Sequence, residues 1–242
     1  MTTMHDERTW AIARHRIAED VVGSVVVWAI FTALVIAVGA AIAIFGTIGA
    51  SVWEEASQFS RWYAGAVGVY LTTVYLPLYV AHGQTRREFA RQTPPVVAMF
   101  AAVLAVLMTV GFVVEAGVYT AFDWPQELTR EHLFDAPTDV GWVFVQFFLL
   151  LAVWTVAGTV VGAGFYRNPG LGIALLLGAL PAVVLVEALI GPAWFGLEGL
   201  LYPTLPAGSV AWAVAVCLGV LGVGLAAMWL LVREMPLRNR DG

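Results

Sequence analysis

The amino-acid sequence predicts an all-α membrane protein with six transmembrane helices in a single domain, residues 1–242. Composition gives the first indication, because 60% of the residues are hydrophobic and the mean hydropathy is +0.83. The second indication is the length of the apolar stretches. Six of them reach the ~20 residues that a helix needs to cross a hydrocarbon layer. No linker or low-complexity tract divides the chain, and a soluble class is excluded.

The spans are expected at residues 21–48, 62–81, 95–122, 142–166, 171–191 and 210–232. Residues 9–20 precede them, with Trp10 on an apolar face and Arg14 and Arg16 turned away from it. This pattern predicts an amphipathic helix in the membrane interface, which is either an anchor or a contact for a cytosolic partner. Residues 192–209 are apolar, aromatic and interrupted by proline and glycine. They predict a broken outer element between the last two spans.

Small residues and prolines mark positions inside the spans. Gly158 and Gly162 form a GxxxG pair in the fourth span. Such a pair lets a second helix approach closely, either from the same chain or from another copy. Pro77 is expected to bend the second span, because proline removes a helical hydrogen bond.

The arginines predict the orientation of the spans. All 12 basic residues are arginines, and short cytoplasmic loops retain positive charge. With the N-terminus in the cytoplasm, only Arg61 and Arg130 fall outside. The cytoplasmic set is then Arg8, Arg14, Arg16, Arg86, Arg87, Arg91, Arg167, Arg233, Arg238 and Arg240. We therefore expect both termini inside, and Glu54 and Glu55 in the first outer loop.

The stretch HGQTRREFARQTPP follows the second span and concentrates charge in an apolar chain. Thr85 and Glu88 have the spacing of a capping box, which predicts that a helix begins there. Pro94 and Pro95 are expected to end it, so a short helix is predicted at residues 85–93. Its one bulky apolar residue, Phe89, lies beside arginines, as is typical of protein interfaces. Anionic lipid headgroups and a plain positive loop are alternatives that remain open.

The segment GQTRREF, placed after the second of six spans, resembles the ABC-2 type permease subunits of ABC transporters. The resemblance implies that residues 85–93 form a coupling helix docked on a separate ATPase. Gly83 would then allow the turn, and Thr85 and Glu88 would cap the helix. The residues implied to face the ATPase are Arg86, Arg87 and Phe89.

The resemblance also implies partners and a location. The chain would pair with a second permease subunit, identical or different, and with two ATPase copies that bind ATP and Mg. It would lie among lipids in the cytoplasmic membrane of a bacterium and act as an exporter. No cofactor in this chain and no nucleic-acid partner are expected. The complete absence of lysine agrees with this, since a Walker phosphate loop needs one.

Two carboxylates, Glu115 and Glu187, are predicted toward the outer side of the third and fifth spans. A charge in a span is costly, so each either lines a polar cavity, carries a proton, or pairs with a neighbouring helix. In the second outer loop, Glu131 and His132 belong to a sparse acidic pattern. We interpret this pattern as a solvated interfacial helix and not as a metal site.

Other functional classes remain as alternatives to the permease. A proton-coupled secondary transporter would use Glu115 and Glu187, although the inverted repeats typical of that class are not visible. A non-transporting scaffold or immunity protein would need no ATPase. An enzyme is not expected, because the sequence has no HExxH motif and no histidine inside a span.

Overall fold

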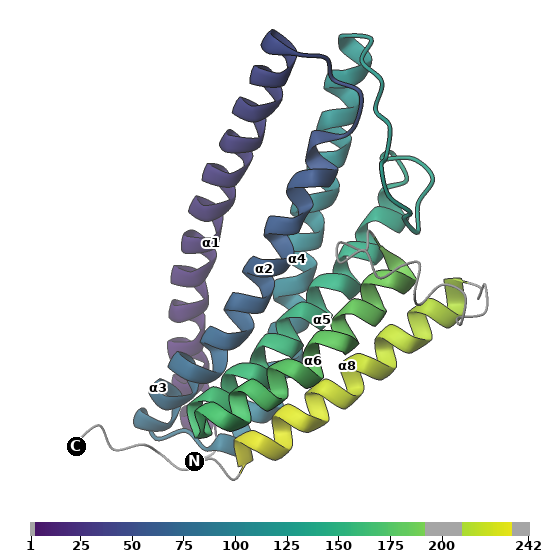
Figure 1. Cartoon of the computed structure of the whole chain (residues 1–242). Coiled ribbons are helices and arrows are strands. Elements are labelled where there is room, and N and C mark those ends of the chain that lie inside the picture. The colour runs from purple at the N-terminus through teal and green to yellow at the C-terminus, as the bar shows by residue number, and fades with distance from the viewer. Residues whose placement is uncertain (1–2, 192–209, 234–242) are drawn as a thin grey trace.

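The computed structural model describes residues 3–191 and 210–233, and its secondary structure there is all helical (Figure 1). The elements are α1 (Thr3–Phe45), α2 (Val52–Tyr70), the π-helix η1 (Leu71–Tyr75), α3 (Leu76–Ala81), α4 (Arg86–Ala121), α5 (Val140–Arg167), α6 (Pro169–Ile190) and α8 (Val210–Arg233). Within these ranges, six helical stretches are long and apolar enough to cross a membrane, which agrees with the predicted number of spans. The broken outer element expected at 192–209 lies outside the described residues.

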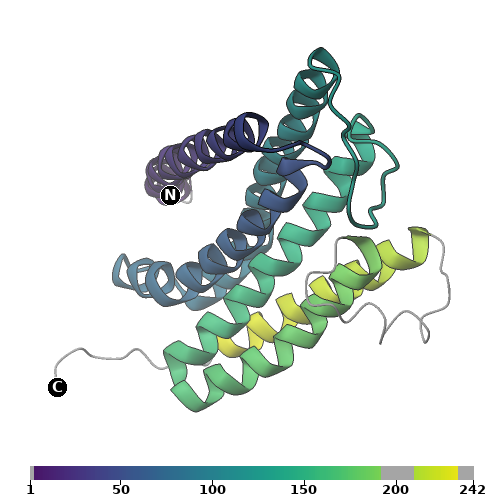
Figure 2. The same ribbon diagram turned by 45° about the horizontal axis from the view of Figure 1, so that its top comes forward.

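Helix α5 forms the centre of the bundle, with α2, α4, α6 and α8 packed around it (Figures 1 and 2). Its sequence is apolar on every face, and most of its side chains are buried. A helix that is hydrophobic all round is typical of such a central position. The other spans each keep one apolar face exposed, as expected for helices that face lipid.

The crossing of α2 and α5 is very close and depends on glycines. A Cβ atom added to Gly68 would lie 2.1 Å from the carbonyl oxygen of Thr155, and one added to Gly158 would lie 2.1 Å from that of Gly65. Small residues at such crossings let two backbones touch. The GxxxG pair of the fourth span therefore packs within the chain: Gly162 faces Val69 and Thr72.

Helix α1 runs for 43 residues without a break, roughly 65 Å at 1.5 Å per residue. The sequence predicted a separate interfacial helix at 9–20, but in the structure these residues and the first span form one continuous helix. Near its middle, α1 packs on α2 through Trp28 and Phe31, and the ring of Phe31 stacks on that of Phe59 at 4.7 Å. Figure 2 shows α1 on the side of α2 that is remote from α6 and α8.

The second span begins ten residues earlier than predicted, at Val52 instead of residue 62. Ser51 caps this helix, since its hydroxyl accepts a hydrogen bond from the backbone nitrogen of Glu54 at 3.0 Å. Glu54 and Arg61 are therefore helical and fully buried, and the expected first outer loop is wrong in this part. A hydropathy profile scores a charged residue as polar even when partners inside the protein satisfy its charge, so the profile placed the start of this span too late.

The same span changes hydrogen-bond register before Pro77. Residues Leu71–Tyr75 form a π-helical turn, and α3 then begins with Pro77 in its first turn. Proline has no N–H for the preceding helical turn, and π-bulges are one way in which a helix accommodates this. The hydroxyl of Thr73 donates to the carbonyl oxygen of Val69 at 2.8 Å, which satisfies one acceptor of the irregular turn.

Pro94 and Pro95 do not end the helix that begins after Thr85. Helix α4 contains both and continues to Ala121, so the prediction of a separate helix at 85–93 is wrong. Proline is tolerated inside transmembrane helices where protein packing supports the turn that loses hydrogen bonds. Here Ala90 and Thr93 are buried beside the prolines, and the hydroxyl of Thr93 donates to the carbonyl oxygen of Phe89 at 2.9 Å.

We expect Gly68→Ala to destabilise the folded protein by about 1–3 kcal/mol, because the new methyl group overlaps the backbone of α5. The matched control is Gly178→Ala in α6, where nothing lies within 4 Å of the added Cβ. Thermal unfolding of the detergent-solubilised variants, followed by tryptophan fluorescence, measures both. Equal melting temperatures for the two variants would contradict the close crossing.

Candidate functional site

The first candidate site is the turn between α3 and α4, which contains the GQTRREF motif. Gly83 has a positive φ of 81°, a conformation that glycine adopts readily and that suits the predicted turn. The capping box is also present. The Thr85 hydroxyl accepts from the Glu88 nitrogen at 3.2 Å, and the Glu88 carboxylate accepts from the Thr85 nitrogen at 2.8 Å.

Phe89 points into the protein and not outward. Its side chain is 6% exposed, and its ring meets that of Tyr79 edge-on at 5.7 Å. It belongs to a small apolar cluster with residues of α3, α5 and α8, among them Leu76 and Val232. The expectation that Phe89 faces a partner is therefore wrong. The ring instead fixes the first turn of α4 to the bundle.

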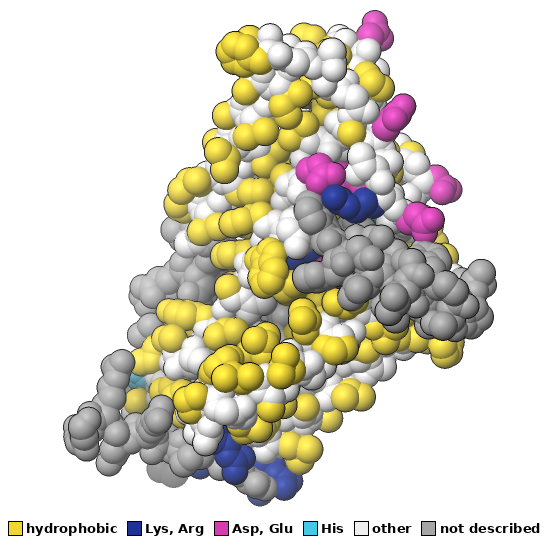
Figure 3. Space-filling model, in the orientation of Figure 1, with side chains coloured by type: hydrophobic (Ala, Val, Ile, Leu, Met, Phe, Trp, Pro, Cys, Tyr) yellow, Lys and Arg dark blue, Asp and Glu magenta, His cyan; other side chains and the backbone are white. Residues whose placement is uncertain are grey.

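The exposed side of this turn is basic. Arg87, Glu88 and Arg91 are exposed, and Arg86 is half-buried. Arg167 at the end of α5 and Arg233 at the end of α8 are exposed at the same end of the bundle. The guanidinium of Arg233 lies over the ring of Trp229, 5.0 Å from its centroid. Figure 3 shows basic side chains at this end, whereas carboxylates, with a basic side chain among them, lie toward the opposite end.

Glu115 stabilises the start of α2. Its carboxylate accepts hydrogen bonds from the Trp53 nitrogen at 2.8 Å, the Ser51 hydroxyl, and the side-chain nitrogen of Gln126 at 2.9 Å. An anion at a helix N-terminus also interacts favourably with the helix dipole. The neighbouring Tyr119 hydroxyl donates to the carbonyl oxygen of Ala50 at 3.2 Å. Of the three explanations given for this carboxylate, these contacts support pairing with a neighbouring helix.

Glu187 forms a buried ion pair with Arg61. Their nearest atoms, Oε1 and a guanidinium nitrogen, lie 3.3 Å apart, and both side chains are almost completely buried. The indole nitrogen of Trp154 donates to the same oxygen at 3.0 Å. The pair joins α2, α5 and α6 about 14 Å along α2 from its first residue. Both candidate carboxylates thus face protein.

The second candidate site is a set of contacts around Glu54, closer than Arg61 to the start of α2. The sequence analysis did not predict it. The carboxylate of Glu54 accepts from the backbone nitrogens of Thr129 at 2.8 Å and Arg130 at 3.0 Å, and it lies 3.1 Å from Nε2 of His132. The other ring nitrogen of His132 lies 2.8 Å from the amide nitrogen of Gln146 in α5. These contacts tie the segment after α4 to α2 and α5.

The segment between α4 and α5 is irregular, so the solvated interfacial helix expected there is wrong. Some of its polar groups instead contact buried partners: the backbone nitrogens of Thr129 and Arg130 and the ring of His132 contact Glu54. Ser51-Val-Trp-Glu54 has the capping-box spacing in the sequence and could have revealed an earlier start of α2, which would have brought Arg61 inside. The lone Gln146 in an apolar run is a second such signal.

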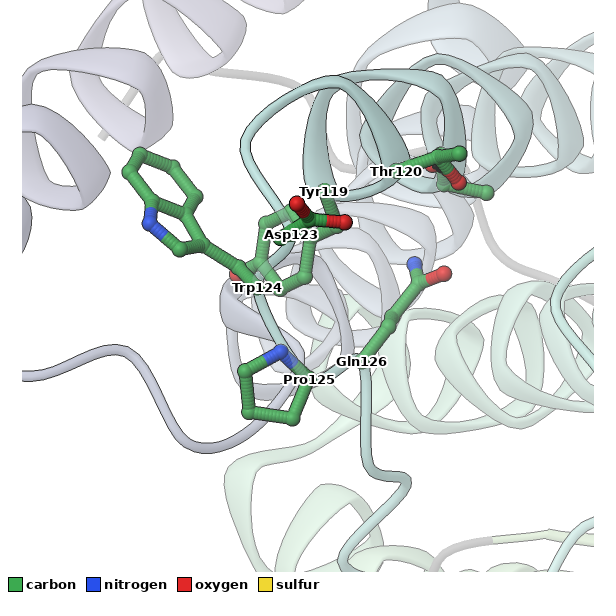
Figure 4. A pocket seen from close by; sticks show the side chains of 7 residues that line it. Tyr119, Thr120, Asp123, Trp124, Pro125 and Gln126 are labelled. Carbon is green, nitrogen blue, oxygen red and sulfur yellow. Dashed lines mark hydrogen bonds between the residues drawn. The ribbon is translucent and has the colours of Figure 1, made fainter.

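An open pocket of about 490 Å³ lies where α4 ends (Figure 4). It is lined by Ala116, Tyr119 and Thr120 of the helix and by the following residues 123–126. Asp123 has a positive φ of 52° and reverses the chain there. Within the described ranges, no three histidine, cysteine or acidic side chains are grouped as metal ligands.

We expect Glu187→Gln to destabilise the protein by about 3–5 kcal/mol, because it leaves the buried Arg61 charge uncompensated. The double variant Arg61→Met with Glu187→Gln should recover most of this loss. The exposed pair of Arg130 and Glu55, 3.1 Å apart, provides the control, and Glu55→Gln should cost less than about 1 kcal/mol. Chemical unfolding in detergent gives the values, and an equal cost for both single variants would rule out a special role for the buried pair.

A scan against protein-family models found no match, and searches of the curated proteins and of the solved structures found none either. The resemblance to ABC-2 type permeases therefore rests on the GQTRREF motif and on the order of the spans.

Proposed function

We propose that the chain is the transmembrane subunit of an ATP-driven exporter of the ABC-2 type, coupled to a separate ATPase. The observation that carries the proposal is the capped turn before α4, which presents Arg87 and Arg91 to solvent beside a buried anchor. ATP and Mg belong to the ATPase. Two copies of that subunit and a second permease subunit complete the assembly, and lipid surrounds the spans.

The turn is suited to transmit force because it is rigid on its inner side. Phe89 and Ala90 are buried against neighbouring helices, and the capping box satisfies the first amides of α4. Arginine in such a position offers several donors to carboxylates on a partner. In this proposal the arginines contact the ATPase, whereas Phe89 supports them from below.

The charge distribution supports a cytoplasmic position for this turn. At its end of the bundle, the described side chains include Arg86, Arg87, Arg91, Arg167 and Arg233 and one carboxylate, Glu88. On the face drawn in Figure 3, the acidic side chains that the structure describes lie toward the opposite end. Positive charge is retained on the cytoplasmic side of bacterial membranes. We therefore place the α3–α4 turn and both termini in the cytoplasm.

The alternative of a proton-coupled carrier has less support. Glu187 is engaged by Arg61 and Trp154, and Glu115 is engaged by the start of α2. Carboxylates with fixed partners are suited to hold helices together. A scaffold or immunity protein differs from the proposal in one measurable respect, since it needs no ATPase.

Replacing Arg87 and Arg91 with alanine should uncouple transport. The chain is co-expressed and purified with any ATPase whose gene lies beside its own, and ATP hydrolysis and copurification are measured. We expect at least a tenfold loss of association, because desolvated interface arginines contribute about 2 kcal/mol each.

The matched control is Arg167→Ala with Arg233→Ala, which removes two exposed arginines from the same end but outside the turn. This variant should keep the ATPase. Equal association of both variants with the ATPase would show that the turn is not the docking site. Absence of any ATPase partner for the unchanged chain would favour the scaffold or the carrier.

Cysteine labelling tests the orientation. Cys217 is completely buried, and Cys217→Ala provides a background without native thiols. In intact cells, an impermeant maleimide should label Asp135→Cys and should not label His82→Cys, although both positions are exposed on the protein. The reverse pattern would place the basic end outside and contradict the proposal.

A further inference from the structure

The proposed function gives no role to His132, a histidine whose side chain is buried at the end of the bundle opposite the arginine-rich turn. Its side chain is 1% exposed and lies between Glu54 of α2 and Gln146 of α5, both of which are fully buried. Its ring stacks on Phe134 at a centroid distance of 4.4 Å. The segment after α4 is thus attached to two different spans through one titratable ring.

The hydrogen bonds determine which ring nitrogen carries the proton. The backbone nitrogen of Leu133 can only donate, and it donates to Oε1 of Gln146 at 2.7 Å. The amide NH₂ of Gln146 therefore faces Nδ1 of His132, at 2.8 Å, and Nδ1 must accept. The proton is then on Nε2, which donates to Glu54 at 3.1 Å. This network fits a neutral imidazole.

Protonation of the His132 ring disturbs its contact with Gln146 at Nδ1 but not its contact with Glu54 at Nε2. An Nδ1–H would face the amide NH₂ of Gln146, so two donors would oppose each other. Rotating the amide by half a turn supplies an acceptor to Nδ1–H but turns the NH₂ toward the Leu133 nitrogen. In either case one buried donor loses its acceptor, which is costly. The contact of Nε2 with Glu54 is strengthened, because it becomes an ion pair.

We propose that His132 is a proton-sensitive latch: when the ring is protonated, the segment between α4 and α5 is released from α5 and stays attached to α2. In the neutral form the segment is held by both spans. In the charged form Glu54 keeps Thr129, Arg130 and His132, whereas Leu133 separates from Gln146. The proposal is independent of coupling to an ATPase, since it concerns the opposite end of the bundle.

The charged groups around His132 have partners of their own, so protonation of the ring is expected to affect mainly its contacts with Glu54 and Gln146. Glu54 is the charged group that contacts the ring, and α5 contributes the neutral Gln146. On the segment itself, Arg130 pairs with Glu55 at 3.1 Å, and Glu131 is exposed. Deeper in the bundle, Arg61 is paired with Glu187. Release at Leu133 would also loosen Phe134, which is buried against Phe112 of α4.

Spin labels attached before the pH is changed test the latch. In the Cys217→Ala background, one label is placed at Asp135→Cys and another at Glu127→Cys, two exposed positions on either side of His132. The carbonyl oxygen of Glu127 is held by the Ser51 nitrogen at 3.0 Å, so this position reports the α2 attachment. Electron paramagnetic resonance spectra are compared at about pH 8 and about pH 5, the range in which histidine changes charge.

At the lower pH, the mobile population of the label at position 135 should rise about tenfold, as expected for the loss of one buried hydrogen bond. The label at position 127 should not change. His132→Gln should abolish the response at position 135. Gln146→Glu should also keep that label immobile at low pH, because a carboxylate accepts from both the Leu133 nitrogen and Nδ1–H.

Three results would overturn the latch. The first is a spectrum at position 135 that does not depend on pH in the unchanged network. The second is equal mobilisation at positions 127 and 135, which would mean that the whole segment detaches. The third is a full pH response in Gln146→Glu. If His132→Gln fails to fold, the comparison of the unchanged network with Gln146→Glu still decides the question.

Discussion

The close crossing of α2 and α5 is the constraint on which the rest of the molecule depends. Where Gly68 and Gly158 meet, the two backbones are in contact and leave no space for lipid. Arg61, farther up α2, is thereby enclosed beside Trp154 and Glu187. A buried guanidinium is costly unless a carboxylate pairs with it, and Glu187 of α6 provides that carboxylate. One backbone contact thus leads to the ion pair that joins three spans.

The two ends of the bundle differ in whether their charged side chains are bonded within the chain or exposed to solvent. At the end where α2 begins, the carboxylates of Glu54 and Glu115 are directed inward and accept hydrogen bonds from backbone nitrogens of other segments. At the basic end, Arg87 and Arg91 project into solvent. Groups already satisfied within the chain stabilise the fold, whereas exposed charges on a well-supported turn are available to another molecule. The proposed docking on an ATPase rests on this contrast.

Hydropathy was sufficient to predict six spans, because each contains a long apolar run that does not depend on tertiary contacts. The errors arose where tertiary contacts override local pattern. Arg61 is charged and yet inside, since Glu187 neutralises it from a distant helix. Pro94 lies within α4, since packing supports the helix around it. The contacts of His132 with Glu54 and Gln146 could not be predicted, because these residues are far apart in the sequence. The capping box at Thr85 was predictable, since all its atoms are local.

The continuity of α4 through its prolines has a mechanical consequence. Thr85 and Glu115 lie near opposite ends of one helix, about 45 Å apart at 1.5 Å per residue. A helix supported along its length behaves as a rod, so an axial shift at the basic turn arrives at Glu115 with little loss. Glu115 holds the first turn of α2. A push on one side of the membrane would therefore act on the far end of a different span.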